Sequence, residues 1–347
     1  MRRALAALVV ALALAIPTAI GAQSDFITFR FERYLEALRK QAGMPGLSAA
    51  IVQDNQIVWE IGLGYQDVEA GVPATPDTPY YVADLTSMLS ATLVLQCVEQ
   101  GRLGLQAPVV VPSALPAAQA TTATVGQLLR HSPGGAGFSY DPARFSALTN
   151  IVSRCMDDSF KEAIARRVLD RLAMRRSVPG TDVLNPGPSD FDNAQLLVYQ
   201  DVLLQIAKPY RLDRRGRSSL SQYPPPVFNA ATGLVTTVRD LASFAMALDT
   251  QTLLHADTLA AAWAVPPGTT SPAFGLGWFV QIYNGQPVVW HFGNTPDASS
   301  ALFIHLPARH KTLVLLANSD GLAATFSLPA GDVTASPFAR LFLSLFG

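Results

Sequence analysis

The chain has 347 residues, enough for one large domain or two modest ones. Hydrophobic residues make up 49% of it and charged residues only 15%, below the ~25% of an average soluble protein, so a large core is expected. The net charge is −1, and the densest basic run, residues 211–217, adjoins a proline-rich stretch typical of a solvated loop. This balance argues against a nucleic-acid partner.

Residues 1–22 have the pattern of a secretory signal peptide. Two arginines precede an apolar run, residues 4–16, and small residues follow at a cleavage position after Ala22. Cleavage there leaves residues 23–347 as the mature chain. An uncleaved anchor is the alternative, because residues 4–22 approach the minimum length of a membrane span. The pattern predicts a periplasmic or secreted protein, with a membrane contact only if the segment is retained.

Periodicity and turn residues predict an α+β chain with strands near both ends. Asp54–Asn55 marks a turn between the first two strands, residues 108–123 and 218–226 are expected to be loops, and residues 193–206 irregular or partly helical. Helices are predicted over residues 26–41, 85–101, 124–130, 145–156, 159–174, 238–249, 256–263 and 335–346, and strands over residues 47–52, 57–65, 274–283, 286–292, 299–306 and 312–317.

This order predicts an antiparallel sheet flanked by the terminal helices. The sheet region comprises residues 23–76 and 218–347, and a mainly helical region, about residues 77–217, is inserted between them.

The two cysteines, Cys97 and Cys155, fall in or beside predicted amphipathic helices. Export permits a disulfide between them, but buried free thiols are common in such helices, and we favour two free thiols. The sequence has no Cys-x-x-Cys or His-Glu-x-x-His motif, and His305 and His310 are too loosely spaced to indicate a metal site. No metal and no cofactor are therefore expected.

Ten segments, in order, carry the motifs of one enzyme family: Pro45–Leu47, Gly62–Tyr65, Pro76–Thr78, Ala91–Gln96, Glu99–Leu103, Leu128–Ser132, Gly233–Leu241, Gly275–Trp278, His291–Gly293 and Leu316–Ser319. As a set they resemble the β-lactamase-related serine hydrolases, which include class C β-lactamases, D-alanyl-D-alanine carboxypeptidases and related esterases. The resemblance covers nearly the whole mature chain and implies a β-lactamase/transpeptidase-like fold.

The chemistry of that family depends on three elements, and this chain keeps one of them in full. Where the family has Ser-x-x-Lys, with a nucleophile and the amine that activates it, this chain has Asp84 and Ser87. Where the family has Tyr-x-Asn, Tyr140 is kept, but Pro142 replaces the asparagine and offers no side-chain hydrogen bond. The strand motif His-x-Gly, which lines the site and helps to form the oxyanion hole, is intact at residues 291–293.

The residues themselves allow a structural and a chemical interpretation. Asp84 is expected to cap the helix that follows it, and its alternative role is a carboxylate nucleophile or base. Ser87 is expected to be a polar filler in place of the lysine, and its alternative role is a relocated nucleophile. Tyr140, His291, Gly293 and Asn294 are predicted to line a binding cleft.

These features predict an exported, catalytically inactive homologue that keeps the cleft for binding or regulation. The resemblance implies a peptidoglycan-like peptide, an acyl ester or a β-lactam-like small molecule as ligand, or a partner hydrolase. The alternatives are an active serine hydrolase with a rewired site, using Tyr140, His291 and a loop serine such as Ser132 or Ser139, and a structural paralogue that binds nothing.

Overall fold

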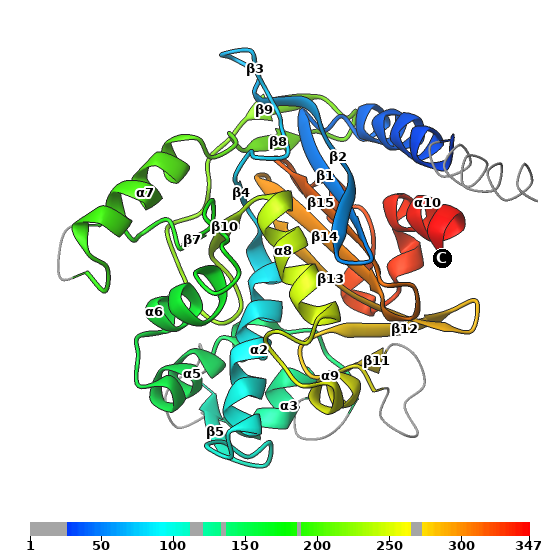
Figure 1. Cartoon of the computed structure of the whole chain (residues 1–347). Coiled ribbons are helices and arrows are strands. Elements are labelled where there is room, and N and C mark those ends of the chain that lie inside the picture. Colours follow the sequence, from blue (N-terminus) through cyan, green and yellow to red (C-terminus); the bar gives the residue numbers. More distant parts are fainter. Residues whose placement is uncertain (1–25, 112–120, 133–136, 186–188, 265–272) are drawn as a thin grey trace, which may run out of the picture.

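The computed structural model of the protein describes residues 26–111, 121–132, 137–185, 189–264 and 273–347. An eight-stranded antiparallel sheet forms its centre (Figure 1). In spatial order the strands are β11 (Ala273–Phe274), β12 (Phe279–Tyr283), β13 (Gln286–Thr295), β14 (Ser299–Leu306), β15 (Lys311–Ala317), β1 (Gly46–Gln53), β2 (Gln56–Asp67) and β3 (Val72–Pro73). The predicted α+β fold, with an antiparallel sheet and terminal helices, is confirmed.

The first and the last strand of the sheet in sequence are neighbours within it. β1, near the N-terminus, pairs with β15, near the C-terminus, and Ala50 lies opposite Val314. The turn between β1 and β2 holds Asp54 and Asn55 with φ of 50° and 61°, the left-handed pair of a tight hairpin. Both faces of the sheet are covered, so β1 is almost wholly apolar rather than alternating.

One face of the sheet carries the terminal helices, residues 26–41 and α10 (Pro337–Phe346). Ala49 and Ile51 of β1 belong to this core, in which the Phe31 ring lies 6.3 Å from that of Phe342. Ala50 and Val52 point to the opposite face, where α8 (Val238–Asp249) and α2 (Thr86–Glu99) pack. Because alternate side chains of β1 point to opposite faces of the sheet, this strand contributes to two separate cores.

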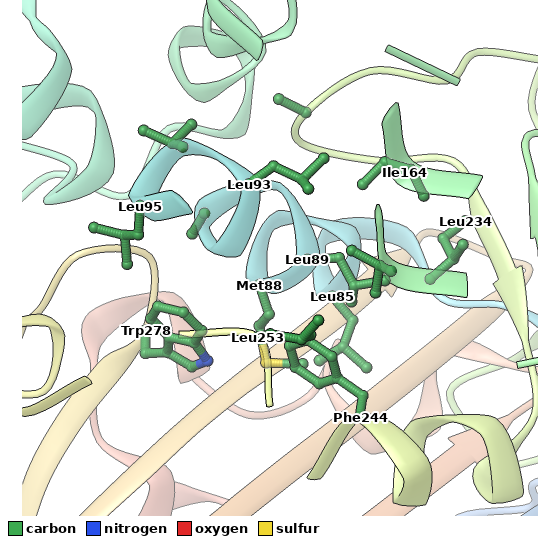
Figure 2. Packing of buried hydrophobic residues seen from close by; sticks show 14 of the residues in the cluster. Leu85, Met88, Leu89, Leu93, Leu95, Ile164, Leu234, Phe244, Leu253 and Trp278 are labelled. Atoms are coloured by element: carbon green, nitrogen blue, oxygen red, sulfur yellow. The ribbon is translucent and has the colours of Figure 1, made fainter. Parts of the chain in front are cut away.

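The helix α2 lies inside the second core and is buried along most of its length. Figure 2 shows Met88 and Leu89 near Phe244 of α8, while Leu93 lies on the side facing Ile164. All of its residues from Thr86 to Cys97 are buried. This helix therefore holds its first turn in a fixed position beside the sheet.

The stretch 77–217 contains, in its described part, five α-helices besides α2, and it contributes strands to three small sheets. Its helices are α3 (Val125–Leu129), α4 (Pro142–Phe145), α5 (Leu148–Met156), α6 (Phe160–Ile164) and α7 (Asn193–Leu204), and α9 (Ala256–Ala262) lies outside it, before β11. The small sheets pair β4 (Tyr80–Tyr81) with β10 (Leu234–Thr236) and β7 (Val178–Pro179), β5 (Pro108–Val111) with β6 (Thr121–Thr124), and β8 (Tyr210–Leu212) with β9 (Ser218–Leu220).

Several segments differ from the sequence predictions. The predicted loop 108–123 contains the β5–β6 hairpin, since the run of valines in β5 is β-branched and buries every second side chain. The predicted loop 218–226 begins with β9, and residues 193–204 form a regular helix capped by Asp192. The helix predicted over 159–174 keeps α-helical geometry only to Ile164 and continues as a π-helical turn, Ala165–Leu169.

The expectation of two free thiols is wrong. Cys97 of α2 and Cys155 of α5 form a disulfide with a Cα–Cα distance of 6.3 Å. The two helices pack side by side, which the amphipathic pattern of each alone did not reveal. Among the residues the structure describes, no helix is both long and apolar enough to cross a membrane. The predicted signal segment 1–22 lies outside those residues.

Candidate active site

The candidate site lies between two pieces of backbone. The helix side consists of residues 82–87, which form the 3-10 turn η1 (Ala83–Leu85) and the start of α2. The strand side consists of residues 291–294 of β13. Ala83 adopts a left-handed φ of 48°, which turns the chain sharply before the helix.

Gly293 allows the two sides to approach each other. A Cβ atom at this position would lie 2.0 Å from the carbonyl oxygen of Val82 and 3.2 Å from the backbone nitrogen of Leu85. Any side chain would therefore push the strand away from the η1 turn. The glycine of the His-x-Gly motif is explained by this contact alone, without a chemical role.

Asp84 does not cap its helix, contrary to the prediction. No side chain caps the N-terminus of either η1 or α2. The Asp84 carboxyl instead lies near the backbone N–H of Asn294 on the strand side, which acts to lower its pKa. Burial is the larger influence and raises the pKa of Asp84 to about 7. Near neutral pH the site therefore holds a carboxyl group that is only partly ionised.

Ser87 meets His291, 204 residues away in sequence. The Ser87 Oγ lies 2.9 Å from the His291 Nε2, and both side chains are buried. Burial lowers the pKa of His291 to about 4, so the imidazole is neutral at pH 7. Its Nδ1 lies 2.7 Å from the carbonyl oxygen of Phe292, and only a protonated Nδ1 can donate there.

The proton position on His291 decides the direction of the Ser87 hydrogen bond. With Nδ1 protonated, Nε2 is an acceptor and the Ser87 hydroxyl can donate to it. The same hydroxyl also lies 2.7 Å from the backbone carbonyl oxygen of Asp84, and its single proton serves only one of the two acceptors at a time. Sequence reasoning missed this pair, because nothing within α2 points to a base for Ser87.

Tyr140 joins the site from the segment before α4. Its ring centroid lies 6.2 Å from that of His291 and 5.3 Å from that of Phe292. Burial, with a smaller contribution from the Asp84 charge, raises the pKa of Tyr140 well above its usual value, so the phenol stays neutral. The structure thus brings together Asp84, Ser87, Tyr140 and His291.

Pro142 has a structural task of its own. It occupies the first position of α4, where its missing N–H costs nothing, and Asp141 caps the helix by accepting the N–H of Arg144 at 3.1 Å. The family motif Tyr-x-Asn has become a helix start. No side-chain amide can act at position 142.

His131 was not singled out from the sequence and supports Tyr140. Its Nδ1 accepts the N–H of Asp141 at 3.0 Å, and its ring stacks on Phe145 and lies 4.7 Å from the Tyr140 ring. Burial lowers the pKa of His131 to about 3, which keeps the ring neutral. Its left-handed φ of 47° is a feature that a sequence pattern does not reveal.

The loop serines Ser132 and Ser139 have no hydrogen bond to a histidine or carboxylate side chain among the described residues. The Ser132 hydroxyl hydrogen-bonds to the backbone carbonyl of Gln127, and Ser139 is exposed. The described residues contain no group of three or more His, Cys, Asp or Glu side chains able to hold a metal ion. The side chains brought together at the site offer a carboxyl, a hydroxyl, a phenol and an imidazole group.

The Beta-lactamase family model matches residues 31–331. The chain belongs to this family. It is 35% identical over 75 residues to the human serine beta-lactamase-like protein LACTB, mitochondrial. The aligned stretch covers 22% of this chain and 14% of the human protein. It is 34% identical over 132 residues to penicillin-binding protein 4 of Amycolatopsis lactamdurans. The aligned stretch covers 36% of this chain and 34% of that protein. The aligned stretches thus span about a third or less of these relatives.

Solved structures support the fold of this family member. A penicillin-binding protein homologue from Pyrococcus abyssi matches with a TM-score of 0.73 at 21% identity, over 92% of this chain and 77% of that one. A class C beta lactamase from Rhodobacter sphaeroides matches with a TM-score of 0.66 at 16% identity, over 90% and 97% of the two chains. At such identities the likeness shows the β-lactamase/transpeptidase-like fold.

Proposed function

We propose that this chain is an exported, catalytically inactive member of the β-lactamase family that keeps its site for binding. One observation carries the proposal: Asp84 stands in the nucleophile position, with its carboxyl near the N–H of Asn294. The resemblance assigns this part of the strand to the oxyanion hole. A carboxyl group in this place competes with the oxygen of an acyl substrate for the same space. When ionised, it also repels the negative charge that develops in the transition state.

The activating group is lost together with the nucleophile. Removal of the catalytic serine of a hydrolase typically costs ~10⁶ in rate. Here Ser87 replaces the lysine as well, and its short hydroxyl is bound to His291 and the Asp84 carbonyl. Pro142 removes the asparagine amide independently. Three changes in one site support loss of the acyl-transfer reaction rather than a single substitution in an active enzyme.

Hydrolysis through Ser87 and His291 is the second candidate, favoured by their 2.9 Å contact and by the neutral imidazole. Two features count against it. Ser87 is 3% exposed and His291 is 0% exposed, so an acyl carbon would have to enter a packed region. Ser87 also lies one helical turn, about 5 Å, beyond the position of the family nucleophile.

Labelling with active-site-directed probes tests the proposal. The full chain is treated with a fluorophosphonate serine probe and with a labelled penicillin, followed by mass spectrometry of the modified peptide. We expect no labelling. Covalent modification of Ser87, abolished by Ser87→Ala, would instead establish the second candidate.

A restoration experiment asks which change blocks the chemistry. Asp84→Ser with Ser87→Lys returns the nucleophile and its amine, and adding Pro142→Asn returns the third element. We expect penicillin labelling to appear in the triple variant and to be weaker or absent in the double variant. A triple variant that folds and stays unlabelled would place the block elsewhere in the site.

Ligand binding separates a binding protein from a purely structural one. The proposed ligands are a peptidoglycan-like peptide, an acyl ester and a β-lactam-like small molecule. A ligand at 100 times its Kd raises the free energy of unfolding by about 2.7 kcal/mol, which raises the Tm by a few degrees. Muropeptides and cephalosporins are the probes, and a shift that Tyr140→Ala removes would locate the ligand at this site. An unchanged Tm with every probe would count against ligand binding.

A further inference from the structure

The N-terminal helix, residues 26–41, exposes a face that the fold does not use. Its inner face is fixed by Phe31 and Leu35, both 0% exposed, and the Phe31 ring contacts Phe342 and Phe346 of α10. On the outer face Phe26, Phe29 and Tyr34 are 59%, 56% and 53% exposed. At 100° per residue these three side chains share one side of the helix with Arg30 and Arg33.

Arg30 and Arg33 on this outer face have no acidic partner among the described residues. The helix has two described acidic side chains, and both have partners elsewhere: Glu32 accepts the Trp59 Nε1–H, and Glu36 forms ion pairs with Arg39 and Lys40. The Arg30 and Arg33 guanidinium groups lie over the Phe26 and Phe29 rings, each 5.8 Å from the ring centroid. The face thus alternates aromatic rings with cations.

Aromatic rings beside arginines are typical of helices that lie in the headgroup layer of a membrane. The rings enter the boundary between headgroups and acyl chains, and the guanidinium groups meet anionic phosphates. A protein partner would more often meet a contiguous apolar patch, whereas on this face two arginines lie among the rings.

The place of the helix in the chain points to the same occupant. It begins within ten residues of the apolar run 4–16, the predicted export or anchor segment. In Figure 1 the helix lies at the edge of the molecule, drawn in blue, on the side away from α7. Phe26, Phe29 and Tyr34 are exposed there, so this face is accessible.

We propose that the outer face of residues 26–41 docks on an anionic phospholipid surface. This contact would hold the protein at the membrane whether or not the preceding segment is retained, with the sheet and the candidate site facing away from the lipid. The inference does not depend on whether the site is active.

A site-specific fluorophore tests the contact in the full chain. Both cysteines are in the disulfide, so a cysteine introduced by Phe29→Cys is the single reactive thiol and can carry a polarity-sensitive dye. Leu204→Cys, on α7 and 79% exposed, is the matched control. Vesicles of phosphatidylcholine with phosphatidylglycerol should shift the emission at residue 29 to the blue and leave residue 204 unchanged. Vesicles of phosphatidylcholine alone should give a much smaller shift.

Charge reversal tests the electrostatic part. Each arginine near an anionic surface contributes about a fivefold gain in partitioning, so Arg30→Glu with Arg33→Glu should weaken the vesicle-induced shift by at least roughly tenfold. Arg214→Glu with Arg215→Glu, in the exposed β8–β9 turn, should leave it unchanged. Added salt should weaken the wild-type contact.

Three outcomes would overturn the proposal. They are equal shifts at residues 29 and 204, equal responses to anionic and neutral vesicles, and a shift at residue 29 that grows with protein concentration in the absence of lipid. The last would assign the face to a second copy of the chain. A retained apolar segment does not obscure the result, because the dye reports the environment of residue 29 itself.

Discussion

The helix side and the strand side of the site have diverged to different degrees. On the strand side, residues 291–293 keep the family motif, and Gly293 lies in close contact with Val82. On the helix side both reactive side chains of the family motif are replaced, at Asp84 and Ser87. Packing constrains the backbone on both sides. The proposed loss of the reaction would therefore free the side chains at positions 84 and 87 and leave the scaffold constrained.

The new side chains contact the opposite side of the site. The Asp84 carboxyl lies near the N–H of Asn294, and the Ser87 hydroxyl lies within hydrogen-bond distance of His291. These two polar groups thus face another part of this chain. The two sides are held together by contacts that a ligand would have to exchange rather than simply add.

The largest expected effect concerns the support of the helix side. The disulfide between α2 and α5 closes a loop with a sequence separation of 58. Replacing both cysteines by alanine should lower the free energy of unfolding by about 4 kcal/mol, because the unfolded chain regains the entropy of that loop. Urea unfolding of oxidised wild type and of the double variant measures the difference. Equal stability would mean that packing alone fixes α2.

The next effect concerns the distance between the two sides. Gly293→Ala places a methyl group against the Val82 carbonyl, so the strand must move, and we expect a loss of about 3 kcal/mol or more. Gly104→Ala is the control, because a Cβ there meets no atom within 4 Å, and it should change stability by less than ~0.5 kcal/mol. Similar losses in both variants would show that the close approach of Gly293 is not constrained.

A third effect separates the charge of Asp84 from its shape. The pKa of Asp84 is raised from 3.8 to about 7 in the folded state, so the folded protein binds this proton more tightly than the unfolded chain. Wild-type stability should fall as pH rises from about 4 to about 7, by on the order of 3 kcal/mol for this group. Asp84→Asn should match wild type near pH 4 and be more stable near pH 8. Parallel pH profiles of wild type and variant would contradict the buried carboxyl.

The sequence was sufficient for the scaffold but not for the contacts across the site. Short apolar runs such as residues 312–317 predict the strands, and the family motifs give their order. The pair Ser87–His291 bridges 204 residues, and each member alone reads as an ordinary buried polar residue. Pairing of Cys97 with Cys155 likewise depends on which helices are neighbours.

Asp84 illustrates a different limit. A carboxylate at a helix start predicts a cap, since local hydrogen bonding usually decides its position. Here the left-handed turn at Ala83 and the approach of Gly293 bring the Asn294 N–H within reach. A tertiary contact therefore replaced the local one, and no property of residues 82–87 alone could have shown it.

The smallest effect tests the contact between the two sides. Ser87→Ala leaves the His291 Nε2 without its hydroxyl partner in a buried position, which should cost about 1–2 kcal/mol. Ser90→Ala is a matched control, because the Ser90 hydroxyl is equally buried on α2 but bonds only to the Thr86 carbonyl within the helix. A loss of stability in Ser87→Ala, larger than in Ser90→Ala and with no change in any residual ester hydrolysis, is the expected result for a structural pair. If Ser87→Ala instead abolished a measurable hydrolysis while stability was unchanged, the pair would be a nucleophile and its base, and the replaced helix side would have acquired a new reaction rather than lost the old one.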